Sequence, residues 1–253
     1  MAKLYFRPSF QEFRGHHTEL AREAVLCLIG QVAWQSGSLG ALCGRGGSGR
    51  RGVWRIRGHA ARRVVGAARD SGADFILVAG DTFEENGVDR ILVQKVADIV
   101  GSFGGPVYVI PGNHDPLVPG SVWDHPAWKA SANVHVLREE RPVEIPGGTL
   151  YPCPVRAKRS GRDPTAWIRP EEGQGIRVGL AHGTVEGVHQ EEPDYPIARG
   201  AATRARLDYL ALGHWDSTAT YAGPDGTTRM AFQGTSTLFP KLTCHAALAT
   251  AAG

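Results

Sequence analysis

The chain has 253 residues and a mass of 27.1 kDa, which suits one large α/β domain. Its hydrophobic content of 42% and charged content of 21% are ordinary globular values and exclude a wholly disordered chain. The formal net charge is +3, but residues 1–63 hold 11 of the 28 basic residues and only 3 of the 25 acidic ones. The basic excess is therefore local to the N-terminal part. Such a segment is more often a solvated arm than a surface that binds polyanions.

Four scattered cysteines form no C-x-x-C pair, which argues against a zinc ribbon and against a disulfide scaffold. The apolar run at residues 24–33 is shorter than the roughly 20 residues of a membrane span. Glu19 and Glu23 directly before this run argue against a secretory signal peptide. We therefore expect a cytoplasmic protein with no membrane association.

From residue 61 the chain alternates helical and extended patterns. Residues 61–72 predict a helix that ends at a glycine, and residues 73–81 predict a buried strand. Residues 88–104 predict a second helix because their apolar residues recur on one face, and residues 106–115 predict the next strand. This β-α-β order with buried, non-alternating strands predicts parallel pairing with the helices outside.

The later chain predicts more strands than helices. Short apolar segments separated by Pro, Gly and Asp turns lie at residues 133–137, 141–145, 148–155, 176–183, 207–215 and 228–234. This layout favours an α/β fold of the αββα type, a four-layer sandwich of two mixed β-sheets flanked by helices, with residues 1–253 as a single domain. Residues 36–58 are glycine- and arginine-rich without a usable period, so residues 1–58 form an atypical segment: a loop, a disordered arm or an erroneous sequence.

Metal-ligand side chains follow four of the predicted strands. The segments are "AGDTFEE" with Asp81, "PGNHDP" with Asn113, His114 and Asp115, "LAHGT" with His182, and "LGHWDS" with His214 and Asp216. Ligands of α/β sheets bind beyond the carboxyl ends of strands, so one site could gather all four segments. Carboxylate, amide and imidazole groups together favour Mn, Fe or Zn, whereas a structural zinc site would need sulfur ligands.

Each of these signals is weaker alone than in the set. Asp81 by itself could be a turn or helix-cap residue, and His182 by itself is more often a hydrogen-bonded core histidine than a ligand. The "GNHD" segment is more specific, and its combination with a strand-end His and a following "GHWD" favours a metal site.

The ordered motifs resemble those of the calcineurin-like metallophosphoesterases. Within that superfamily, the SbcD-type DNA repair exonucleases look most similar to "ADFILVAGDTFEENGVD" and "VYVIPGNHDPLVPGSVW", and the resemblance spans residues 60–235. It implies a metal-dependent enzyme that hydrolyses phosphodiester bonds of DNA with one or two divalent metal ions, Mn first and Fe or Zn as alternatives. It also implies an SbcC-type ATPase partner and leaves a homodimer open.

The resemblance further implies roles for the metal-ligand residues. Asp81 would bridge two metal ions, while Asn113, His182 and His214 would complete the shell of one of them. Asp216 stands where the family has a second His, and a carboxylate can replace that ligand.

Roles in proton transfer are implied for the two residues that follow the amide. His114 would not bind metal but would donate a proton to the leaving oxygen, or stabilise the developing charge as a cation. Asp115 would be its orienting carboxylate.

The family's first motif, an Asp-x-His on the first strand, is missing. No Asp precedes Asp70, and the nearest counterpart is "VAWQSG", in which Ala33 takes the Asp position and Gln35 the His position. Only Asp81 and Asp216 are then left for the second ion, which should bind weakly or not at all.

Three explanations of this departure stay open: a one-metal enzyme, a corrupted N-terminal sequence that hides an ordinary enzyme, and a protein that binds without cleaving. We favour the second because of the composition of residues 36–58. The C-terminal extension that caps DNA and docks the ATPase in such nucleases is expected to be absent. A phosphodiesterase or phosphatase for a small nucleotide or a phosphoprotein is the rival enzyme, and an inactive metal- or DNA-binding remnant is the rival non-enzyme.

Two further segments have both a functional and a structural reading. The basic "RAKRSGRD" at residues 156–163 could contact a phosphate backbone, although a solvated loop is the commoner case. The aromatic "VWDHPAW" at residues 122–128 could line a substrate cleft or pack in the core.

The vacant first motif gives a prediction. Ala33→Asp should raise the number of divalent ions bound per chain if this position is the missing ligand, because a carboxylate coordinates and a methyl group does not. Inductively coupled plasma mass spectrometry of the purified protein measures the number of metal ions per chain and tests whether residue 33 occupies the Asp position of the first motif. An unchanged stoichiometry would show that residue 33 does not occupy the first-motif position.

Overall fold

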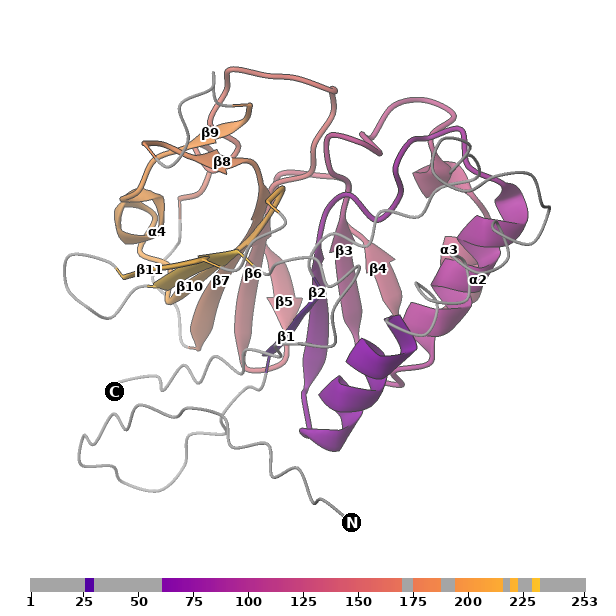
Figure 1. Ribbon diagram of the computed structural model, residues 1–253. Helices are drawn as coiled ribbons and strands as arrows, with labels where there is room; N and C mark the ends of the chain where they lie inside the picture. The colour runs from indigo at the N-terminus through magenta and orange to yellow at the C-terminus, as the bar shows by residue number, and fades with distance from the viewer. Residues whose placement is uncertain are drawn as a thin grey trace, which may run out of the picture.

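A computed structural model shows two β-sheets stacked face to face between outer layers of helix and loop (Figure 1). The structure describes residues 26–29, 61–169, 175–187, 194–215, 219–222 and 229–232. The expected α/β sandwich is confirmed. Within the described ranges, none of the helices has both the length and the apolar character that crossing a bilayer requires.

The first sheet contains four parallel strands in sequence order: β1 (Leu26–Ile29), β2 (Phe75–Ala79), β3 (Val107–Ile110) and β4 (Val134–Val136). The helix at residues 61–70 and helix α2 (Arg90–Gly101) cover its outer face (Figure 1). Helix α2 begins where the Asp89 side chain accepts a 2.7 Å hydrogen bond from the backbone amide of Ile91, which satisfies one of the free amides of its first turn.

The second sheet contains six strands and is mixed. Its spatial order is β11 (Ala219–Ala222), β12 (Arg229–Phe232), β10 (Tyr209–Gly213), β7 (Ile176–His182), β6 (Gly148–Pro152) and β5 (Val143–Ile145). The three inner pairings are parallel and the two outer pairings are antiparallel. Every later strand expected from the sequence forms. The sequence pattern predicts two mixed sheets, but the described strands of the first sheet are all parallel, because crossovers return the chain to the same end before each new strand.

Short elements complete the described part of the chain, and the sequence pattern did not predict them. They are the 3₁₀ turn η1 (Val122–Asp124), α3 (Ala127–Ala130), β8 (Thr184–Val185), β9 (Pro196–Ile197) and α4 (Ala201–Arg204). None is long enough to show a periodicity in the sequence. Buried residues of β9 and α4 pack on the outer face of the second sheet, so the fourth layer is made of short elements rather than long helices (Figure 1).

Strand β2 lies between two apolar layers. Phe75, Leu77 and Ala79 belong to the core between the two sheets, whereas Ile76 and Val78 belong to the core between the first sheet and its helices. All five are nearly or fully buried, which explains why the segment reads as a continuous apolar run without alternation. The strand is therefore held on both faces, and the residue after it starts from a fixed position.

Candidate metal centre

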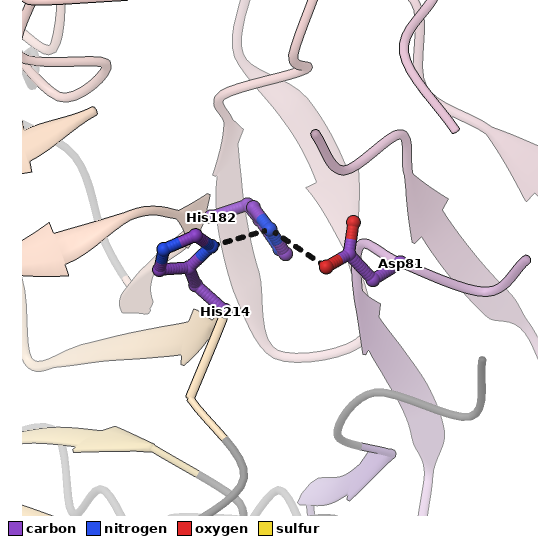
Figure 2. A group of neighbouring side chains, drawn as sticks. All are labelled: Asp81, His182 and His214. Atoms are coloured by element: carbon purple, nitrogen blue, oxygen red, sulfur yellow. Dashed lines mark hydrogen bonds and ion pairs between the residues drawn. The ribbon is translucent and has the colours of Figure 1, made fainter. Parts of the chain in front are cut away.

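Residues from the carboxyl ends of four strands meet at one edge of the sandwich. Asp81 follows β2, Asn113 follows β3, His182 ends β7 and His214 follows β10. One ligand atom each of Asp81, His182 and His214 lies within 4.8 Å of the others, and Figure 2 shows these three side chains pointing toward one another. Within the described residues, these His and Asp side chains are spaced closely enough to hold one metal ion.

The His182 ring occupies the middle of this group and is fully buried. Its Nδ1 lies 2.8 Å from the carbonyl oxygen of Ala79, and its Nε2 lies 2.8 Å from Asn113 Oδ1 and 3.3 Å from Asp81 Oδ2. A carbonyl oxygen only accepts hydrogen bonds, so this partner assigns the proton of a neutral ring to Nδ1. The lone pair of Nε2 then faces two oxygen atoms, an arrangement that a shared proton or a cation stabilises.

Asp81 and His182 shift each other's pKa values. Burial lowers the pKa of His182, but the facing Asp81 carboxylate, the Ala79 carbonyl and the Asp115 carboxylate raise it, and the net direction is upward. Burial likewise raises the pKa of Asp81, and the interactions with His182 and with the backbone amide of His114 outweigh it, so the pKa falls below its usual value. Without a metal ion the pair is thus stabilised as carboxylate and imidazolium, and a divalent cation would take the place of that proton.

His214 completes the group from the second sheet. Its Nδ1 lies 3.2 Å from Asn113 Oδ1 and 3.3 Å from His182 Nε2. Burial and then the neighbouring His182 lower its pKa to about 4, so the ring is neutral at pH 7, which is the form that coordinates metals. The strand register places His182 beside Gly213, and the chain must turn sharply to bring the next residue back to the centre.

The turns that deliver the ligands use unusual backbone. Asp81 has a φ of 48° and His214 a φ of 115°, both in the left-handed half of conformational space that residues with a Cβ seldom adopt. Such positions cost about 1–3 kcal/mol each and cluster at functional sites. Two of the four candidate ligands therefore carry backbone strain that the surrounding packing must offset.

Two glycines permit the close approach of these turns. A Cβ at Gly80, whose φ is 83°, would lie 2.4 Å from Nδ1 of His182, and a Cβ at Gly112 would lie 2.2 Å from the backbone nitrogen and from Oδ1 of Asp81. Neither distance is compatible with a side chain. The four oxygen and nitrogen ligands converge only because these residues have none.

The donor set fits a single divalent ion. Asp81 offers a carboxylate, Asn113 an amide oxygen, and His182 and His214 one imidazole nitrogen each, and the atoms already lie at contact distance from one another. Asp216, which the sequence suggested for a second ion, lies outside the described residues, as do Ala33 and Gln35 at the position of the missing first motif. The geometry of the described part of the chain thus supports one metal position.

His114 lies next to this group without being part of it. Its backbone amide donates a 2.9 Å hydrogen bond to Asp81 Oδ1. Its ring Nδ1 lies 3.2 Å from the carbonyl oxygen of Glu84 and 3.7 Å from Glu84 Oε1, and about a third of the side chain is exposed. The carbonyl contact assigns a proton to Nδ1, and no described residue forms a hydrogen bond with Nε2, which is therefore available to a substrate.

The sequence did not single out Glu84 as a site residue. It lies three positions after Asp81 in "GDTFEE", where acidic side chains are common on exposed turns. Only the fold shows that the turn after β2 places its carboxylate beside the His114 ring.

From the sequence, the Asp115 carboxylate is expected to orient the His114 ring. In the structure, this carboxylate does not contact that ring. It is fully buried, and its two oxygens accept hydrogen bonds from the backbone amides of Phe83 at 2.8 Å and Gly112 at 2.7 Å. Its own carbonyl oxygen accepts a hydrogen bond from the indole of Trp123. Asp115 therefore joins the turn after β2 to the turn after β3, because the backbone directs its side chain into the core and the His114 ring toward the surface.

The anchoring role of Asp115 yields a prediction. Asp115→Asn should lower the free energy of unfolding by about 1–3 kcal/mol, because the amide nitrogen cannot accept from one of the two buried backbone amides. Chemical denaturation measures the change, and Asp70→Asn, at an exposed carboxylate on the helix at residues 61–70, is the matched control. Equal stability of the two variants would contradict the anchoring role.

Comparisons with known proteins agree with this geometry. The family model described as "Calcineurin-like phosphoesterase" matches residues 57–216. The chain is 29% identical over 163 residues to the "Uncharacterized metallophosphoesterase YhaO" of Bacillus subtilis, and this match covers 60% of the chain and 39% of that relative.

Solved structures show the same fold at low sequence identity. The crystal structure of TT1561 of Thermus thermophilus superposes with a TM-score of 0.54 at 11% identity, covering 84% of this chain and 90% of that one. The structure of a dimetal phosphatase from Danio rerio superposes with a TM-score of 0.50 at 11% identity, covering 83% and 87% of the two chains. With its strand-end ligands and a family match over more than half of its length, this chain belongs to the calcineurin-like phosphoesterase family.

Proposed function

We propose that this phosphoesterase hydrolyses phosphodiester bonds of DNA, as an exonuclease of the SbcD type that acts in DNA repair. The observation that carries the phosphoester chemistry is the convergence of Asp81, His182 and His214 on one point, with His114 beside it. The choice of DNA is supported by the resemblance of the segments around Asp81 and His114 to that group of nucleases.

The residues present define what the chain contributes to hydrolysis. Asp81, Asn113, His182 and His214 would hold a divalent ion, which when bound polarises a phosphoryl oxygen and lowers the pKa of coordinated water. Nitrogen and oxygen donors without sulfur suit Mn, which we propose as the metal, with Fe and Zn as alternatives. The cross-sheet hydrogen bond from His182 to Ala79 keeps that ring turned toward the centre.

His114 is the proposed proton donor. With Nδ1 held at the Glu84 carbonyl, Nε2 is the nitrogen left to face the leaving oxygen of a bound phosphodiester. The Glu84 carboxylate also lies near this nitrogen, with Oε1 3.7 Å from Nδ1. The backbone amide of His114 donates a hydrogen bond to Asp81, so the proposed proton donor is held next to the ligand group.

The proposal extends to the surroundings of the reaction. We propose the cytoplasm as the compartment, because the chain has no cysteine pattern of an extracellular scaffold. An SbcC-type ATPase is the proposed partner. This chain spans 39% of the length of the curated relative that it matches.

Substrate preference is the first test. With Mn²⁺ present, the protein should degrade single- or double-stranded DNA, and a chelator should stop the reaction because the ligand group holds no metal without free ions. Gel analysis of end-labelled DNA measures this, with the chromogenic diester bis(p-nitrophenyl) phosphate as a parallel substrate. Hydrolysis of the small diester with intact DNA would replace the nuclease by a phosphodiesterase for small nucleotides. Binding of DNA without turnover of either substrate would identify a non-catalytic remnant.

The role of His114 is the second test. His114→Ala should lower kcat by about 10²- to 10⁴-fold, as expected for loss of general acid catalysis, while the metal content stays that of the parent protein. His182→Ala is the contrasting variant and should lower the metal content itself, because it removes a central ligand. Loss of metal from the His114 variant would mean that this residue is a ligand and not the proton donor.

A further inference from the structure

A basic loop lies beside the turn that carries Asn113 and His114. Strand β6 runs parallel to β7, so the chain leaves β6 at the edge where His182 ends its strand. Just beyond β6, the Val155 amide donates a 3.3 Å hydrogen bond to the carbonyl of Pro111, and the Val155 carbonyl accepts a 2.8 Å bond from the amide of Leu117. The residues after Val155, which we call the basic loop (156–162), therefore start at the rim of the metal centre.

The far side of the basic loop is also fixed. The hydroxyl of Tyr195 donates to the Ala157 carbonyl at 2.7 Å and accepts from the Ala157 amide at 3.2 Å. The Ser160 amide donates to Asp194 Oδ1 at 2.8 Å, and the Ser160 carbonyl accepts from the Tyr195 amide at 2.8 Å. Both ends are thus held to the framework, and a ligand that binds here need not order the backbone first.

The basic loop presents cations that are not neutralised by the described part of the chain. Lys158 and Arg159 are exposed, and neither has a hydrogen bond or ion pair with any described residue. The neighbouring acidic side chains have partners of their own: Glu140 pairs with Arg162 at 3.0 Å, Asp163 pairs with Arg204 at 3.2 Å, and Asp194 accepts the Ser160 amide at 2.8 Å. The positive charge of Lys158 and Arg159 is therefore available to an anion.

We propose that Lys158 and Arg159 bind backbone phosphates of a DNA strand next to the phosphate that is cleaved. This inference rests on the proposed nuclease function and names how the strand beyond the metal centre is held. Three residues of chain reach at most about 10 Å, so Lys158 stays near the Pro111 contact. Along the axis of a DNA duplex, successive phosphates of one strand are about 3.4 Å apart. The two cations thus lie within reach of phosphates a few nucleotides from the scissile one.

The chemistry of the loop favours a polynucleotide over a small phosphodiester. A small diester fills only the metal centre and does not extend to exposed side chains beyond its rim. Lys and Arg on an exposed loop bind phosphates as point charges without reading bases, which suits an enzyme that must move along any sequence. The metal centre then supplies the chemistry, and the basic loop supplies affinity for the length of the strand.

The double variant Lys158→Ala plus Arg159→Ala tests this inference in the full chain. Binding of a fluorescein-labelled single-stranded oligonucleotide, measured by anisotropy in EDTA across salt concentrations, should weaken. The slope of the logarithm of the association constant against the logarithm of the salt concentration should become less negative by about 1.4. Each phosphate contact to a single strand contributes about 0.7, and the variant loses two contacts. Turnover of bis(p-nitrophenyl) phosphate with Mn²⁺ should equal that of the parent protein.

The control is Arg63→Ala plus Lys95→Ala, which removes two exposed cations from the helices over the first sheet. It should leave both the salt slope and the small-diester turnover unchanged. An oligonucleotide affinity and slope equal to those of the parent in the Lys158/Arg159 variant, or an equal loss in the control, would overturn the inference. The nuclease proposal fails by a different result, namely that the parent protein cleaves the small diester and leaves DNA intact.

Discussion

The hydrogen bond between the His182 ring and the Ala79 carbonyl is the contact on which the rest of the site depends. It joins the end of β7 in the second sheet to the end of β2 in the first, inside a fully buried environment. The bond fixes the proton on Nδ1 and turns Nε2 toward Asp81 and Asn113. One contact thus sets both the closeness of the two sheets at this edge and the chemical character of the centre.

This closeness is costly and is maintained by packing from both sides. Asp81 and His214 have strained backbone, and the turns approach one another so closely that Gly80 and Gly112 cannot carry side chains. Apolar residues of β2 fill the core on both faces of the strand, and the buried Asp115 carboxylate ties the two ligand-bearing turns together. The site is rigid because its strain is balanced by contacts that extend well beyond it.

The candidate ligands and the exposed segments around them are held in different ways. The ligand group and His114 lie on turns that directly continue buried strands, and such turns have little freedom to vary. The segments around them, such as the basic loop, are attached by backbone hydrogen bonds and expose their side chains to solvent. Side chains of these outer segments can therefore change without disturbing the candidate metal ligands.

The sequence alone determined the order of the main helices and strands and indicated the candidate metal-ligand residues. Long apolar runs end directly at Asp81, Asn113, His182 and His214, and both the strand pattern and the ligand chemistry are local properties of the chain. The tertiary structure decided which side chains meet and where each one points. Sequence adjacency made Asp115 look like a partner of His114, yet the backbone turns its carboxylate into the core, and the acidic neighbour of that ring is Glu84. The strand pairing of the first sheet, the short outer elements and the position of the basic loop beside Pro111 were likewise beyond local pattern, because they result from contacts between residues far apart in the chain.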